Sequence, residues 1–153
     1  MHKHLRRLDR VWIDWPIYFI TTCTFKRRPI LASGEVAKIL VDEWQNARDR
    51  HGWAVGWYVI MPNHVHFFCS SEIDAKALPR FIQAWKLWTS KRIGGELKFA
   101  APIWQEEFFD HVMRSSESYS QKWEYVRENP VRAGLVGTAD EWPWQGQVEE
   151  LRL

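Results

Sequence analysis

Residues 53–70 read WAVGWYVIMPNHVHFFCS, and the fold is predicted outward from this segment. Its two runs of β-branched and aromatic residues, 53–61 and 64–70, are typical of β-strands. Pro62-Asn63 between them is typical of a tight turn. Strands joined by so short a turn must run antiparallel, so the sequence predicts a β-hairpin.

The segments around this hairpin alternate between strand and helix patterns. Residues 17–25 and 103–113 have the composition of strands. Apolar residues at helical spacing and capping signals predict three helices. The first begins after an N-cap at Ser33, runs to about Arg50 and is ended by His51-Gly52. The second covers 75–93, with Pro79 in its first turn and Gly94-Gly95 at its end. The third begins at Ser115 or Ser116 and runs through Val126 to a stop or kink at Pro130.

The resulting order, β-α-β-β-α-β-α, is typical of the split βαβ or ferredoxin-like fold. We therefore expect an α+β protein with an antiparallel sheet and helices mainly on one face. The length of 153 residues, with 46% hydrophobic and 26% charged residues and no internal repeat, predicts one domain over 1–153. A basic N-terminal arm at about 1–12 and a short tail at about 145–153 flank it.

Membrane and secreted classes are not expected. The longest apolar runs are far too short to cross a bilayer, and no apolar run of signal-peptide length follows the basic start. Cys23 and Cys69 stand alone in apolar contexts without a CxxC pair. They are typical of reduced core residues, which predicts a cytoplasmic protein.

Basic residues are clustered although the net charge is only +2. Such clusters can form a basic face that binds nucleic acid, and ordinary solvated charge is the alternative. The candidate DNA-binding residues lie in the N-terminal arm and in the second predicted helix: Arg6, Arg7, Arg10, Lys86, Lys91 and Arg92.

His64 and His66 are the first candidates for chemistry. Residues two apart in a strand point to the same face, so both imidazoles project together. Two imidazoles side by side can bind a divalent metal ion if a third ligand completes the site. Two hydrogen-bonded structural histidines are the alternative.

Tyr125 and Asn129 are the second candidates. Four residues apart on one helix, they would share a face and reach one substrate together. Glu128 lies about 100° from Asn129 around such a helix, which makes it the poorer metal ligand. The alternative is a core tyrosine followed by an ordinary Asn-Pro helix stop.

Three motifs in this order resemble one known family. They are MPNHVH at 61–66, WQEEFFDHVMR at 104–114 and YVRENPVRAGLV at 125–136. The chain resembles the REP-associated tyrosine transposases, which belong to the HUH single-tyrosine transposase superfamily. The likeness extends from near Tyr18 to Trp142-Pro143-Trp144.

The resemblance implies a fold of the HUH endonuclease type and a role for each matching residue. It makes His64 and His66 ligands of Mg²⁺ or Mn²⁺, Asn129 a candidate third ligand, and Tyr125 the nucleophile. It adds Arg114, as a candidate phosphate contact, to the DNA-binding residues, and leaves the role of His111 open.

The implied activity is cleavage of single-stranded DNA near hairpins. A 5′-phosphotyrosine would form on the protein, and the strands could then be rejoined in the bacterial nucleoid. Related enzymes include homodimers, so both a monomer and a homodimer stay open. The chain departs from its relatives at Gln145-Gly146-Gln147, where their Ser-rich, Tyr-containing sequence is missing.

Two other functions fit part of the pattern. A non-catalytic nucleic-acid-binding module on a ferredoxin-like sheet predicts exposed aromatic residues where the two histidines stand. A phosphoesterase would need two separated His-x-Ser/Thr motifs, and no such pair stands out. The trio His64, His66 and Tyr125 favours the transposase-like nuclease.

Overall fold

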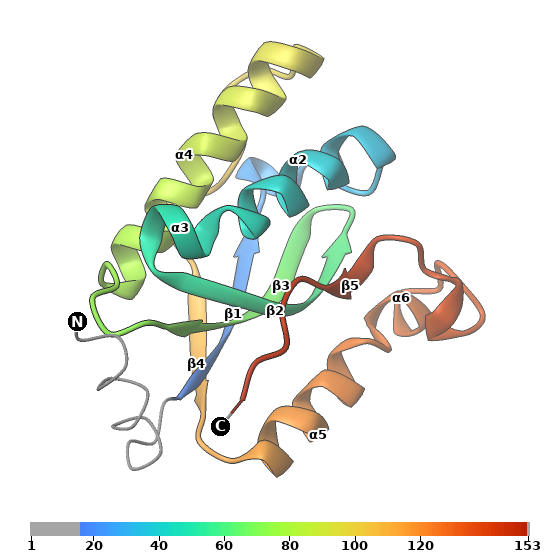
Figure 1. Ribbon diagram of the computed structural model, residues 1–153. Helices are drawn as coiled ribbons and strands as arrows, with labels where there is room; N and C mark the ends of the chain where they lie inside the picture. Colours follow the sequence, from blue (N-terminus) through green and yellow to red (C-terminus); the bar gives the residue numbers. More distant parts are fainter. Residues whose placement is uncertain (1–15, 153) are drawn as a thin grey trace.

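The computed structural model describes residues 16–152. Their central feature is a five-stranded sheet in which every pairing is antiparallel. The spatial order is β4-β1-β3-β2-β5 (Figure 1). The first four strands have the ferredoxin-like order, which confirms the predicted α+β fold. The strands are β1 (Ile17–Cys23), β2 (Trp53–Met61), β3 (His64–Ser71), β4 (Phe109–Met113) and β5 (Gln145–Gln147).

Two helices, α2 and α5, begin where the sequence places capping residues. The hydroxyl of Ser33 accepts a hydrogen bond from the Val36 amide at 3.2 Å, and that of Ser115 accepts one from Ser118 at 3.0 Å. The helices are α2 (Gly34–Gln45), α3 (Ala47–His51), α4 (Leu78–Leu97), α5 (Ser116–Val126) and the short α6 (Asn129–Arg132), with 3₁₀ turns η1 (Phe25–Arg27) and η2 (Ala139–Glu141). None of the helices within residues 16–152 is both long and apolar enough to cross a membrane.

Both faces of the sheet are covered, each by different helices. Val65 and Phe67 of β3 pack in the core under α2 and α4, whereas Phe68 packs in a second core with Trp123 of α5. Figure 1 shows α2, α3 and α4 on one side of the sheet and α5 and α6 on the other. The strand alternation therefore places His64 and His66, which share the face of Phe68, on the α5 side.

Several boundaries differ from the predicted ones, three of them with a visible cause or consequence. Asn46 separates α2 from α3, where one helix to about Arg50 was expected. The predicted break at Gly94-Gly95 is wrong, because α4 continues to Leu97 and ends at Lys98, which adopts a left-handed φ of 64°. Most of the predicted strand 103–113 is irregular, since β4 begins only at Phe109.

A correction applies to the segment that carries the candidate tyrosine. α5 ends at Val126, and Asn129 begins a separate helix with Pro130 in its first turn. Proline suits a first turn because its missing amide hydrogen has no partner to lose there. Tyr125 and Asn129 therefore do not share a face of one helix, contrary to the prediction.

The predicted C-terminal tail is part of the fold. Its residues 145–147 form β5 along β2, and Leu151 is buried in the core under α5. Gly56 of β2 makes this approach possible, because a Cβ at that position would lie 2.7 Å from the Leu151 side chain.

Candidate functional site

His64 and His66 form the centre of the candidate site. They lie two residues apart on β3, and their ring centroids are 4.8 Å apart. Each ring is held by a hydrogen bond at Nδ1: the side-chain oxygen of Asn63 lies 2.8 Å from His64, and the Thr21 hydroxyl lies 2.8 Å from His66. The predicted pair therefore projects from one face with both rings fixed in orientation.

Both imidazoles are neutral near pH 7. Burial lowers the pKa of His64 to about 4, with a contribution from the positive charge of Arg27. Burial lowers the pKa of His66 to about 3, and repulsion from His64, Lys122 and Arg132 adds to the effect. A neutral imidazole has one nitrogen with a free lone pair, which is the form that binds metal ions.

The anchoring bonds determine which nitrogen is free. The Asn63 side-chain oxygen can only accept, so Nδ1 of His64 donates its hydrogen and Nε2 keeps its lone pair. The Thr21 oxygen can accept from Nδ1 of His66 in the same way. Metal-binding histidines commonly donate their second nitrogen to an oxygen, so the pair fits two ligands of a divalent ion.

In the described part of the chain, the side chains most typical of metal sites do not supply a third ligand beside the pair. Within residues 16–152, no group of three His, Cys, Asp or Glu side chains is placed to hold a metal ion. The amide oxygen of Asn129, the predicted third ligand, accepts a hydrogen bond from Arg132. Two protein ligands leave the remaining coordination positions for that amide, for substrate or for water.

Tyr125 carries an accessible phenol near the end of α5. It is 60% exposed, whereas Tyr119, on the same helix, is buried against Phe68. The guanidinium of Arg132 lies over the Tyr125 ring at 4.0 Å and donates to its backbone carbonyl at 2.7 Å. Tyr125 is therefore the tyrosine of α5 that solvent and substrate can reach.

Lys122 connects Tyr125 with the histidines. Its ammonium lies 4.8 Å from the ring centroid of Phe19 and 5.9 Å from that of Tyr125. Phe19 stacks on His66 with ring centroids 5.2 Å apart. The phenol, two cations and two imidazoles thus gather on the α5 face of the sheet.

Sequence analysis missed the two cations Lys122 and Arg132. Lys122 precedes Tyr125 by one helical turn, and Arg132 belongs to the quoted segment 125–136. Neither has a carboxylate partner among the ion pairs of residues 16–152. Both charges are therefore available to an anionic ligand beside Tyr125.

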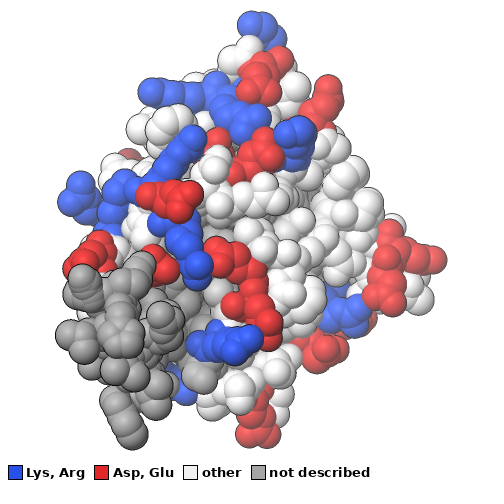
Figure 2. All heavy atoms as spheres, viewed as in Figure 1, with Lys and Arg blue, Asp and Glu red and all other residues white. Residues whose placement is uncertain are grey.

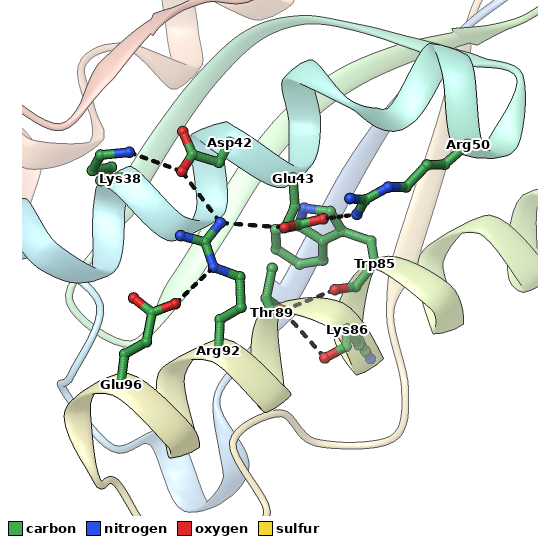
Figure 3. A network of polar contacts seen from close by, with 9 residues as sticks. All are labelled: Lys38, Asp42, Glu43, Arg50, Trp85, Lys86, Thr89, Arg92 and Glu96. Carbon is green, nitrogen blue, oxygen red and sulfur yellow. Dashed lines mark hydrogen bonds and ion pairs between the residues drawn. The ribbon is translucent and has the colours of Figure 1, made fainter.

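Two of the predicted DNA-binding residues, Arg92 and Lys86, are bound to other groups of the protein itself. Arg92 pairs with Asp42 and Glu43 of α2 and with Glu96 of α4 (Figure 3). The ammonium of Lys86 donates to three carbonyl oxygens of residues 105–107, at 2.8 to 3.1 Å, and burial lowers its pKa to about 8. In the view of Figure 2, basic and acidic side chains alternate over the region of α2 and α4.

The other predicted residues have different positions. Lys91 is exposed on α4, on the opposite side of the sheet from the histidines, and Arg114 is exposed just after β4. His111, exposed on β4, pairs with Phe19 and so lies on the α5 face. Arg6, Arg7 and Arg10 lie outside the described residues.

Comparison with known proteins gives the family. Residues 16–129 match the family model described as "Transposase IS200 like". The chain belongs to the IS200-like transposase family. The matched segment contains β1 to β4 and all of α5, so it includes the histidine pair and Tyr125.

Individual relatives agree with this family. A REP-associated tyrosine transposase of Escherichia coli strain K12 is 26% identical over 136 residues, which are 88% of this chain and 78% of the relative. An uncharacterized protein of Haemophilus influenzae is 31% identical over 94 residues; the match spans 48% of this IS200-like chain and about half, 52%, of that relative.

A solved structure shares the fold. It is a REP-associated tyrosine transposase bound to a REP hairpin, with a TM-score of 0.73 and 21% identity. The match covers 87% of this IS200-like chain and 77% of the other chain. The arrangement of strands and helices is therefore that of a transposase fold.

Proposed function

We propose that this protein is a metal-dependent nuclease and strand transferase that cuts single-stranded DNA beside hairpins, with Tyr125 as the nucleophile. One observation carries the proposal: the exposed Tyr125 phenol and the neutral pair His64 and His66 share two cations, Lys122 and Arg132, that have no carboxylate partner within residues 16–152. A nucleophile, positive charge and metal-binding imidazoles in one place suit phosphoryl transfer.

The first reaction step would transfer a DNA strand to the protein. The Tyr125 oxygen attacks the phosphorus, the bond from phosphorus to the 3′ oxygen breaks, and a proton passes to that oxygen. The products are a 5′-phosphotyrosine and a free 3′-hydroxyl. In the reverse sense, a 3′-hydroxyl attacks the phosphotyrosine, a phosphodiester forms and Tyr125 is released. One phosphoester is exchanged for another, so the cycle needs no ATP.

The positive groups of the site would act on the charge of the phosphate. Lys122 and Arg132 stabilise negative charge on its oxygens as the phosphorus is attacked. His64 and His66, with Asn129 as the proposed third ligand, would hold Mg²⁺ or Mn²⁺. A bound divalent ion would supply Lewis-acid polarisation of the scissile phosphate.

The relatives support a hairpin substrate. The Escherichia coli relative is named a REP-associated tyrosine transposase, and the solved relative is bound to a REP hairpin. We extend that substrate to this chain, which would act on chromosomal DNA in the cytoplasm. A single nucleophilic tyrosine holds one strand at a time, so joining two cleaved strands calls for a homodimer or for sequential cleavage.

The covalent adduct is the test. Purified protein is incubated with labelled hairpin DNA carrying unpaired flanks and with Mn²⁺, and a denaturing gel separates protein-linked label. We expect an adduct with the wild type and with Tyr119→Phe, and none with Tyr125→Phe. Tyr125→Phe should still bind the DNA. An adduct in Tyr125→Phe, or peptide mapping that assigns the DNA to Tyr119, would refute the proposal.

A further inference from the structure

An exposed aromatic side chain lies beside the candidate site without a contact that explains it. Among the large hydrophobic side chains of residues 16–152, Phe109 has the largest exposed fraction, 63%. The exposed ring offers apolar surface that a bound ligand can remove from water. Phe109 is the first residue of β4, which forms an edge of the sheet (Figure 1).

The strand register places Phe109 on the face of the histidine pair. Thr21 of β1 is paired with Phe109 on one side and with His66 on the other. Directly paired residues of antiparallel strands project to the same face, and the Thr21 hydroxyl bonds His66 there. Two strand spacings separate Phe109 from His66, which is about 10 Å between their backbones.

A groove extends from β4 toward the nucleophile. It lies between β4 and α5 and is lined by His111, Met113, Ser118, Gln121, Lys122 and Tyr125. His111 is two residues from Phe109 on the same strand face, so Phe109 stands next to the β4 wall of this groove. Tyr125 and Lys122 form the opposite wall.

This combination matches unpaired DNA more closely than an apolar partner. Single strands are bound by aromatic rings that stack on bases and by cations that contact the backbone, and stacking tolerates any base. Beside the apolar Met113 and the Tyr125 ring, the neighbouring groove offers a lysine, an imidazole and an amide that can contact the backbone and bases of DNA. A chain that reaches Tyr125 along β4 would place a base over Phe109 and a phosphate near Lys122.

We infer that Phe109 is the stacking platform for an unpaired base close to the scissile phosphate. This inference rests on the proposed function, because it takes single-stranded DNA as the ligand. It makes Phe109 a positioning residue, since the ring holds the strand and does not take part in bond exchange.

Binding of DNA to the Tyr125→Phe protein isolates this contact from cleavage. The probe is a fluorescent hairpin with an unpaired tail, and fluorescence anisotropy measures its affinity. We expect Phe109→Ala to weaken binding roughly tenfold and Phe109→Tyr to preserve it. The control Leu87→Ala removes a comparably exposed apolar side chain, 55% exposed, from α4 on the other side of the sheet and should leave the affinity unchanged.

Abasic nucleotides test whether the lost contact is with a base. One abasic position in the tail should weaken binding roughly tenfold in the Tyr125→Phe protein that retains Phe109. The same abasic position should not change the affinity of the protein that also carries Phe109→Ala. In a photo-crosslinking version, 5-iododeoxyuridine at that position should attach to the tryptic peptide 99–114, and mass spectrometry should assign the bond to Phe109.

Two results would overturn the inference. One is equal affinity of Phe109→Ala and Leu87→Ala for the tailed hairpin. The other is a change in molecular mass of Phe109→Ala by light scattering with unchanged DNA affinity, which would assign the ring to a contact between copies of the chain. Failure of the proposed function has a different outcome: the wild type forms no adduct, while tail binding still depends on Phe109.

Discussion

Two basic regions of this protein differ in what balances their charge. Between α2 and α4, Arg92 and Arg50 both pair with the buried carboxylate of Glu43, and Arg92 also reaches Asp42 and Glu96 (Figure 3). On the α5 face, Lys122 and Arg132 lie against aromatic rings and have no carboxylate partner within residues 16–152.

We infer from this difference that the paired cations stabilise the fold and that Lys122 and Arg132 bind the proposed DNA substrate. A cation already paired with carboxylates contributes little to phosphate binding, because its partners must first be displaced. An unpaired cation beside a nucleophile keeps its charge for the ligand. We therefore expect substitutions on the α5 face to reduce activity, and substitutions between α2 and α4 to reduce stability.

The largest effect is expected at the histidines. His64→Ala or His66→Ala removes one of two imidazoles that fit a metal ion, so cleavage of single-stranded hairpin DNA should fall on the order of 10³-fold or more. Excess chelator should abolish wild-type cleavage, and Mn²⁺ or Mg²⁺ should restore it. The gel assay for nicked DNA measures both, and circular dichroism verifies the fold.

Arg92→Ala is the matched control for this loss, and it should cut DNA at the wild-type rate at a temperature where it is folded. Undiminished cleavage in excess chelator would contradict the metal assignment.

The next effect compares the cations directly. Lys122→Ala and Arg132→Ala should each lower the cleavage rate by about 10²-fold, because each removes positive charge beside the phosphate. Their DNA binding should also depend less steeply on salt than that of the wild type. Lys86→Ala and Arg92→Ala measure how much the predicted basic residues of α4 contribute, and we expect a smaller change in slope.

The opposite result is that Lys86→Ala and Arg92→Ala reduce the salt dependence of DNA binding more than Lys122→Ala does. It would assign DNA binding to the α4 side of the sheet.

The features that were predicted correctly from the sequence are those that local patterns determine. Local patterns determined the hairpin, with β2 at its predicted bounds, and the caps Ser33 and Ser115. The two-residue period of a strand was enough to place His64 and His66 on one face. These features depend on neighbours in the chain, and so they are visible in its pattern.

The parts that failed depend on contacts between distant segments. Lys122 meets Phe19 only because α5 packs across β1, and Arg92 meets Glu43 only because α4 packs on α2. No spacing within one segment encodes either contact. One error has a local cause instead: Tyr125 and Asn129 do not share one helix, because α5 ends at Val126 and Asn129-Pro130 begins α6.

Stability should depend on the paired cation Arg92 more than on Arg132, which is the opposite of what we expect for activity. Arg92→Ala removes one of two partners of Glu43, whose side chain is only 6% exposed, and should cost about 2 kcal/mol of unfolding free energy. Arg132→Ala removes an exposed side chain and should cost less than about 0.5 kcal/mol. Urea denaturation followed by tryptophan fluorescence measures both. Equal losses in the two variants would mean that the paired and unpaired cations do not differ in their structural role.

The last effect is the pH dependence of the unfolding free energy, which we expect from His51 on the α3 side of the sheet. His51 is buried at the end of α3, and its Nδ1 accepts a hydrogen bond from the Lys76 ammonium at 2.8 Å. Burial lowers the pKa of His51 to about 4, and the charges of Lys76 and Arg50 add to this shift.

Since the ordinary value is 6.5, the unfolded chain takes up a proton between pH 6.5 and 4 that the folded chain does not. Stability should therefore be complete above pH 6.5 and fall as the pH decreases toward 4. His51→Gln keeps an acceptor for Lys76 but cannot be protonated, so its unfolding free energy should fall less steeply over this range. His111→Gln, at an exposed position, is the control and should retain the wild-type slope. If His51→Gln and the wild type lose stability equally between pH 6.5 and 4, the buried neutral His51 is not the source of this pH dependence.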